Sequence, residues 1–387
     1  MANEHGQVKT PASHHHGRKP WWRRVRASGM MILLVVMLIT FGGVAGTTAA
    51  SASSVVSNPP TLLPYANQRG IFFGSAADYW NLPASVDPLY ASTLAANYNG
   101  VTAENAMKFA PTEPAKDQYD FSVADPIVAF AAAHNMHVRG HNLVWGDNNP
   151  AWLEEGTWTR DQLIQIMHDH ISNVVTHFKD KFPGTVTQWD VVNEAVAGPG
   201  QLVPNVWERV IGPDYIPMAF QFARQADPRA QLYLNDYGGE GLGPKSDAIN
   251  WVAAYYKANG APIDGVGLES HFDLNPPRQS DIATNMARLA SEGLKVAVTE
   301  MDVRVSMPSG ALSPSASVQL AQAKIYHDTL ATCLAHPTCT TFVTWGFTDK
   351  YSWIPVGFPG YGWALPFTNL YVHKWAYMDL AVALQGA

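Results

Sequence analysis

Residues 189–194 read Trp-Asp-Val-Val-Asn-Glu, a short run with one internal carboxylate that ends in two polar residues and closes the apolar strand expected at 186–193. Short apolar runs of this kind recur along the chain, and each one predicts a buried β-strand. The eight expected strands cover residues 71–76, 100–104, 137–145, 186–193, 231–235, 265–270, 295–300 and 341–347.

Longer segments with helical periodicity lie between these strands. The clearest of them cover residues 124–135, 160–178, 215–225, 246–259, 281–292 and 317–334. Strands that alternate with helices predict an α/β fold of the (β/α)8 TIM barrel type. An open, doubly wound sheet is the alternative. Such a sheet normally carries a Gly-x-Gly-x-x-Gly turn after its first strand, and this chain lacks that turn.

Polar residues gather where the expected strands end. Seven of the eight strands carry them at or near their C-terminal ends: Glu104 and Asn105, His141 and Trp145, Asn193 and Glu194, Asn235 and Asp236, Glu269 and His271, Glu300 and Asp302, and Trp345. The active sites of barrel enzymes form at this end, because the loops there converge on one pocket. The pattern therefore predicts a catalytic pocket at the barrel mouth.

The composition sets the size of the folded unit and excludes one class of partner. The chain has 387 residues, of which 47% are hydrophobic and 15% charged, so it can bury a large core. No break in composition follows residue 65, and we expect one barrel domain over residues 66–387, a monomer by default. The net charge is −7 and the basic residues of this domain are scattered, so no nucleic-acid partner is expected.

The N-terminus has the pattern of a targeting segment. Residues 18–26 are basic, residues 30–46 are apolar or small, and residues 47–52 are small, which is the order of a secretory signal. We therefore expect residues 1–52 to direct secretion, with cleavage near residues 50–53. An uncleaved membrane anchor is the alternative, although the apolar run is slightly short for a span. Residues 53–65 are rich in Ser, Pro and Ala and predict a linker or an extended arm.

The chain contains two cysteines, Cys333 and Cys339. Because they are close in sequence and lie in a chain expected to be exported, we predict a disulfide that closes a short loop. Two free thiols are the alternative. A loop this short removes little chain entropy, so the bond should stabilise one turn and not the whole fold.

Glu194 and Glu300 form the natural pair for glycosidic bond cleavage. That reaction needs one carboxyl group that protonates the leaving oxygen and a second one that is ionised. The alternative for either glutamate alone is an ion-paired surface residue, but each ends an apolar strand, where an unpaired charge beside the core would be costly. In a closed barrel the fourth and seventh strands face each other across the mouth. If the carboxyl groups are about 5–5.5 Å apart, the configuration of the sugar is retained.

Seven motifs in order carry a resemblance to a known family. They are Thr-Ala-Glu-Asn-Ala-Met-Lys at 102–108, Arg-Gly-His-Asn-Leu-Val-Trp at 139–145, Trp-Asp-Val-Val-Asn-Glu at 189–194, Asn-Asp-Tyr at 235–237, Asp-Gly-Val-Gly at 264–267 followed by His271, Val-Thr-Glu-Met-Asp at 298–302, and Thr-Trp-Gly-Phe-Thr-Asp-Lys-Tyr-Ser-Trp at 344–353. Through them, residues 66–385 resemble the xylanases of glycoside hydrolase family 10. The two cysteines also fall where that family often carries a disulfide.

The resemblance implies a role for each matching residue. Glu194 is expected to be the acid/base and Glu300 the nucleophile, while Asn193 hydrogen-bonds the sugar 2-hydroxyl. His271 and Asp302 are expected to form a chain that keeps Glu300 ionised. The other expected substrate contacts are Lys108, His141 and Trp145 at the cleavage subsite, Glu104 and Asn105 at the next sugar outward, Trp345 and Trp353 above the pocket, Tyr237 on the leaving-group side, and Glu269.

The predicted function is therefore that of a retaining endo-1,4-β-xylanase acting on xylan. No cofactor is expected. No catalytic metal is expected either, because no helical His-x-x-x-His pair joins the motifs. One alternative is a related β-glycosidase with another substrate, since the segment 146–150 after Trp145 departs from the family pattern. The other alternative is a catalytically silent barrel that binds sugar, although such forms usually lack one of the catalytic carboxylates.

Glu269 is the second departure from the family, which usually has Gln at this position. A third carboxyl group near Glu194 and Glu300 should raise at least one pKa in the cluster. We hypothesise that Glu269 is protonated at working pH or meets a different substrate group.

Overall fold

Eight parallel strands form the centre of the computed structural model, which describes residues 61–386. They are β1 (Phe72–Ala77), β2 (Gly100–Ala103), β3 (His137–Trp145), β4 (Val186–Asn193), β7 (Gln231–Asp236), β8 (Gly265–Leu268), β10 (Lys295–Val303) and β12 (Cys339–Thr344). β12 pairs in parallel with both β10 and β1, so the sheet closes on itself. The (β/α)8 barrel prediction is confirmed, and the open sheet is wrong.

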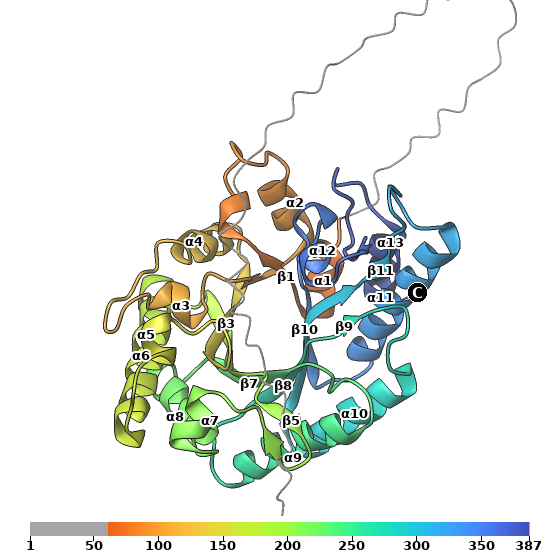
Figure 1. The fold of residues 1–387 in the computed structure, drawn as a ribbon. Helices are drawn as coiled ribbons and strands as arrows, with labels where there is room; N and C mark the ends of the chain where they lie inside the picture. The colour runs from red at the N-terminus through yellow and green to blue at the C-terminus, as the bar shows by residue number, and fades with distance from the viewer. Residues whose placement is uncertain (1–60, 387) are drawn as a thin grey trace, which may run out of the picture. The chain divides into compact units, whose positions relative to one another are not determined.

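A helix follows every barrel strand and packs outside it (Figure 1). In strand order these helices are α2 (Tyr90–Asn97), α4 (Asp125–Ala133), α6 (Arg160–Lys181), α8 (Tyr215–Ala226), α9 (Pro244–Ala258), α10 (Gln279–Ser291), α11 (Ala316–Leu334) and α13 (Trp375–Gln385). Shorter helices lie in the loops: α3 (Phe109–Thr112), α5 (Ala151–Glu154), α7 (Val206–Ile211) and α12 (Ile354–Gly357). α1 (Leu63–Arg69) precedes the first strand.

Local sequence signals fix where several helices begin. Thr159 and Gln162 form a capping box before α6, in which the Thr159 hydroxyl accepts from the Gln162 backbone N–H. The Ser315 hydroxyl caps α11 by accepting from the Val318 backbone N–H. Pro244 starts α9, where its missing N–H leaves no hydrogen bond unmade.

The barrel interior holds a buried polar layer below the mouth. The Arg139 side chain from β3 forms a buried ion pair with Asp190 on β4 and donates to Gln188 Oε1 at 2.7 Å. The Gln188 Nε2 atom in turn donates to the Thr341 hydroxyl on β12 at 2.8 Å, so the layer crosses the barrel. Because every member has a partner, the layer is compatible with burial and fixes the relative register of these strands.

Short strands extend the loops at the barrel mouth. β5 (Val196–Gly198) and β6 (Gln201–Leu202) form a hairpin directly after β4. β9 (His271–Phe272) continues the line of β8 and pairs with the end of β10. β11 (Val305–Ser306) pairs with β13 (Tyr361–Gly362). These elements surround the site described below.

Cys333 and Cys339 form the predicted disulfide, which joins the end of α11 to the start of β12. α1 overlaps the segment expected to be a linker, and Arg69 Nε donates to the Leu384 carbonyl on α13 at 2.7 Å. The expected signal at 1–52 and its cleavage at 50–53 lie outside the described residues. Within residues 61–386, no helix combines the length and hydrophobicity that a membrane span requires.

Candidate active site

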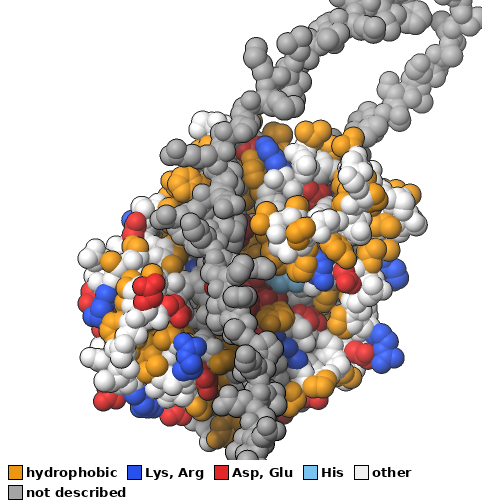
Figure 2. Space-filling model, in the orientation of Figure 1, with side chains coloured by type: hydrophobic (Ala, Val, Ile, Leu, Met, Phe, Trp, Pro, Cys, Tyr) orange, Lys and Arg blue, Asp and Glu red, His pale blue; other side chains and the backbone are white. Residues whose placement is uncertain are grey.

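A cleft of about 550 Å³ opens where the strands end, and its lining includes Glu194, Tyr237, Glu269, His271 and Trp353. Figure 2 shows this face, with histidine and acidic side chains in a central hollow bordered by hydrophobic ones. The cleft lies at the C-terminal ends of the barrel strands, as predicted.

Glu194 is the first residue after β4 and has a left-handed backbone with a φ of 49°. Its N–H donates to the Asn235 carbonyl at 2.8 Å, which holds this uncommon conformation in place. Burial, with added repulsion from Glu300 and Asp236, raises the pKa of Glu194 to about 7. Glu194 therefore keeps its proton up to neutral pH, which suits a general acid.

Glu300 lies within β10 and is only 5% exposed. Its Oε1 atom accepts from Asn235 Nδ2 at 2.8 Å, and its Oε2 atom lies 3.3 Å from His271 Nε2. Burial acts to raise the pKa of Glu300, but the charge of His141 and the hydrogen bond and charge of His271 outweigh it and lower this pKa. Glu300 is therefore ionised where Glu194 is not.

A chain of side chains supports Glu300 from behind. His271 Nδ1 lies 3.0 Å from Asp302 Oδ2, and the Trp353 indole N–H donates to the same oxygen at 2.8 Å. Burial alone would lower the pKa of His271, but the charge and hydrogen bond of Asp302, together with Glu300, raise it to about 10. A protonated His271 donates from both ring nitrogens, which fixes its direction towards Glu300.

Asn235, at the end of β7, connects this strand to residues on or directly after β4, β8 and β10. Its Nδ2 atom is 2.8 Å from Asn193 Oδ1, 2.8 Å from Glu300 Oε1 and 3.2 Å from Glu269 Oε1. Its Oδ1 atom accepts from the Thr299 hydroxyl at 2.7 Å. Asn235 was not among the predicted site residues. Its signals were its position at the end of the fifth strand and its place in the motif at 235–237, neither of which gave it a role.

Glu269 follows β8 and is only 2% exposed. Its Oε2 atom lies 3.7 Å from His271 Nε2. Burial, followed by repulsion from Glu300 and Glu194, raises the pKa of Glu269 well above its usual range. Asn235 has two amide hydrogens for three acceptors, so a proton on Glu269 lowers the competition for them.

The opposite side of the mouth carries a buried cation. Lys108 Nζ donates to Asn105 Oδ1 at 2.8 Å and lies 4.9 Å from the ring centre of Trp145. Burial lowers the pKa of Lys108, although the charges of Glu300, Glu104 and Glu194 oppose this. Burial also raises the pKa of Glu104, to about 7. The structure thus brings Glu104, Asn105, Lys108 and Trp145 to one side of the site.

His141 joins the site to the polar layer below it. Its Nδ1 atom lies 3.0 Å from Asp190 Oδ2 and 3.8 Å from Glu300 Oε1. Its ring meets that of Trp345 edge-on, with the ring centres 5.1 Å apart. Sequence reasoning missed Asp190, although a carboxylate inside an apolar strand signals a buried partner; its partners, Arg139 and His141, lie on another strand.

Tyr237 lines the cleft and is 48% exposed. Lys245 Nζ lies 3.3 Å from the centre of its ring and pairs with Asp236 Oδ1 at 2.9 Å. Asp236 Oδ2 also accepts from the Val196 N–H at 3.0 Å. Asp236 therefore anchors both the Tyr237 side of the cleft and the hairpin that follows Glu194.

Glu269, His271 and Glu300 place potential ligand atoms within 4.8 Å of one another. A metal ion there would need a neutral histidine. His271 has a pKa raised to about 10, and its nitrogens are directed at Asp302 and Glu300. The donor set therefore fits a metal poorly, and the expectation of metal-free catalysis stays a prediction.

A (β/α)8 barrel with one ionised and one protonated glutamate at its mouth defines a glycoside hydrolase. The family model described as Glycosyl hydrolase family 10 matches residues 62–383, and the chain belongs to this family. The resemblance found in the motifs is thereby confirmed, as is the prediction of an enzyme of the hydrolase class.

Several known proteins are similar to the chain. Endo-1,4-beta-xylanase D of Talaromyces funiculosus is 38% identical over 82% of this chain and 75% of that protein. Endo-1,4-beta-xylanase B of Thermotoga neapolitana is 37% identical over 80% of this chain and 87% of that protein. The crystal structure of xylanase 10B from Thermotoga petrophila in complex with xylobiose has a TM-score of 0.80 and 38% identity, over 84% of this chain and 97% of that one.

Proposed function

We infer that the protein is an endo-1,4-β-xylanase that hydrolyses internal bonds of xylan with retention of configuration. The observation that carries this inference is the opposite protonation of two glutamates at one barrel mouth: the pKa of Glu194 is raised to about 7 and that of Glu300 is lowered. The similar proteins named above are xylanases, and one was crystallised with xylobiose. The names of these proteins and the xylobiose in that crystal favour xylan over other β-1,4-linked polysaccharides as the substrate.

The proposed reaction has two displacements. In the first, the Glu300 carboxylate attacks the anomeric carbon while Glu194 gives its proton to the departing glycosidic oxygen. A glycosyl ester on Glu300 forms and the first product leaves. In the second, Glu194 takes a proton from water, the water oxygen attacks the same carbon, and the bond to Glu300 breaks.

The neighbouring residues position this reaction. We propose that Asn193 and Asn235 hold the sugar and the nucleophile in register, because Asn235 donates to both Asn193 and Glu300. His271 and Asp302 keep Glu300 ionised. Lys108, His141, Trp145, Trp345 and Trp353 form the proposed cleavage subsite, with Glu104 and Asn105 beyond it, Tyr237 towards the leaving group and Glu269 beneath the nucleophile.

We also propose that the protein is secreted and acts as a monomer. The proposal of secretion depends on the basic, apolar and small segments of residues 18–52. Secretion would let the enzyme meet a polymer that is too large to enter the cell.

Reducing-sugar release from xylan, cellulose and mixed-linkage glucan tests the substrate, with Glu300→Ala as the control. We expect release from xylan above all and almost none from the variant. Preference for cellulose or mixed-linkage glucan would support the related glycosidase with altered specificity. Equal activity of Glu300→Ala and wild type would refute the nucleophile, and an inactive wild type would support the silent barrel.

A further inference from the structure

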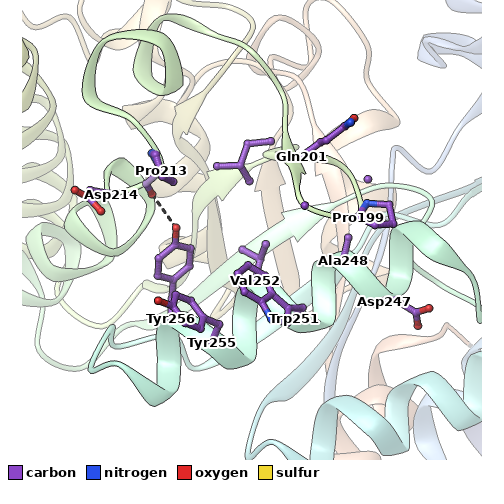
Figure 3. A pocket seen from close by; sticks show the side chains of 13 residues that line it. Pro199, Gln201, Pro213, Asp214, Asp247, Ala248, Trp251, Val252, Tyr255 and Tyr256 are labelled. Atoms are coloured by element: carbon purple, nitrogen blue, oxygen red, sulfur yellow. Dashed lines mark hydrogen bonds between the residues drawn. The ribbon is translucent and has the colours of Figure 1, made fainter.

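A second groove lies outside the catalytic cleft, with a volume of about 750 Å³. One wall is the β5–β6 hairpin, the other is α9, and the segment before α8 closes one end (Figure 3). None of its lining residues belongs to the lining of the catalytic cleft. The proposed mechanism uses none of them.

Two aromatic rings dominate the α9 wall. Trp251 and Tyr255 lie one helical turn apart and are 58% and 47% exposed. Their rings are nearly parallel, with an angle of 10° and centres 4.8 Å apart. Figure 3 shows both side chains on the helix, beside Val252 and below the hairpin. The two rings stack on each other, which covers part of one face of each, and the rest of their aromatic surface stays exposed on a helix whose outward face is normally polar.

The rest of the groove combines apolar floor with polar rim. Tyr256 is held by its hydroxyl, which donates to the Pro213 carbonyl at 3.1 Å. Gln201, Asp214 and Asp247 supply amide and carboxylate groups at the edges. The described lining includes no lysine or arginine, and Arg160 and Arg288 beside the groove are paired with Asp214 and Asp247, so the groove offers no unpaired cation to an anionic ligand. Flat aromatic faces with a few polar groups suit an uncharged sugar chain.

The groove also shares a structural element with the active site. The hairpin that forms its wall begins at Val196, two residues after Glu194, and the Val196 N–H is bound to Asp236 beside the cleft. The groove is therefore connected to the catalytic end of the barrel by a short and tightly held segment.

We propose that this groove is a second binding site for β-1,4-linked polysaccharide, in which the surface of the Trp251–Tyr255 pair that stays exposed packs against sugar rings. This inference rests on the proposed substrate class, and it adds a site that holds the polymer without cutting it. A long or insoluble chain can engage both sites, whereas a short oligosaccharide in the cleft does not need the second one. The site therefore raises the local concentration of polymer at the catalytic cleft.

The experiment compares full-length wild type with the double variant Trp251→Ala/Tyr255→Ala. Depletion from solution onto insoluble xylan measures binding, and product release measures hydrolysis of insoluble xylan and of a soluble xylo-oligosaccharide. We expect the double variant to bind insoluble xylan about tenfold more weakly. It should also hydrolyse the polymer several-fold more slowly and keep wild-type kcat/KM on the oligosaccharide. Trp375→Ala is the matched control, because Trp375 is also exposed on an outer helix.

Three outcomes would overturn the proposal. They are unchanged binding to xylan, an equal loss on the oligosaccharide in a folded variant, and a wild-type dimer that the double variant disrupts. If the double variant does not fold, Gln201→Ala on the exposed hairpin and Trp251→Phe replace it, with weaker binding expected for the first and near-wild-type binding for the second. Xylan binding that is lost in the variant, with no hydrolysis by wild type, would contradict the proposed function alone.

Discussion

Replacing Glu269 by Gln gives the sharpest test of how the carboxyl cluster is protonated. Glu269 Oε1 and Glu300 Oε1 both contact Asn235 Nδ2, at 3.2 and 2.8 Å, so these two oxygens are at most about 6 Å apart. Two full charges at that distance repel by roughly 3 kcal/mol at an effective dielectric constant of about 20. A proton on Glu269 removes this repulsion while Glu300 stays ionised.

The expected consequence appears on the alkaline side of the pH profile. In a protonated state Glu269 has nearly the shape of Gln, so Glu269→Gln should stay within about threefold of wild type at acidic pH. Loss of the Glu194 proton, near its pKa of about 7, limits both proteins at higher pH. Ionisation of Glu269 should lower the activity further, and it can do so only in wild type. The wild-type profile should therefore be acid-shifted, with about tenfold less activity than the variant for each pH unit above the pKa of Glu269.

The assay is kcat/KM on a soluble xylo-oligosaccharide, measured in half-unit steps across the stable pH range. Log kcat/KM should fall with a slope of about one in the variant and approach about two in wild type. Superimposed curves would refute a neutral Glu269. A wild-type alkaline limb at higher pH than that of the variant would show that Glu269 is charged and raises the pKa of Glu194.

Three further variants test other parts of the account. Glu194→Ala should lose about 10²- to 10⁴-fold in activity on xylan but far less on an aryl xyloside whose leaving group needs no proton, and equal losses on both would contradict the acid role. Asp302→Asn should lower the pKa of His271, raise that of Glu300 and move the acidic limb of kcat/KM to higher pH, whereas an unmoved limb would exclude the supporting chain. Cys333→Ser opens a loop of sequence separation 6, so thermal unfolding should show a loss of about 2 kcal/mol with unchanged activity at 25 °C; a larger loss would mean that the bond supports more than one turn.

The barrel strands could be predicted because parallel strands covered on both faces are apolar along their length. Their ends were less predictable. β10 continues to Val303, beyond the expected residue 300, because Asp302 pairs with His271 on β9, a strand too short to have a signal. α2 and α13 went unpredicted, since their apolar residues do not follow a clear helical stripe.

The residues of the site also divide into those that the sequence could predict and those that it could not. Residues at strand ends could be predicted as a group, because the fold alone brings those ends together. The connection through Asn235 could not be predicted, since its partners Asn193, Glu269 and Glu300 are 42, 34 and 65 residues away and meet only in the closed barrel. The raised pKa of Glu194 could not be predicted either, because it depends first on burial and then on neighbours that other strands bring.

The central claim is that Glu300 attacks the sugar. A 2-deoxy-2-fluoro xylobioside with an activated leaving group forms the glycosyl-enzyme and slows its hydrolysis, so mass spectrometry of the digested protein locates the adduct. The account predicts one xylobiosyl ester, on the peptide that contains Glu300. An adduct on Glu194 or Glu269, or turnover with inversion and no adduct at all, would contradict it.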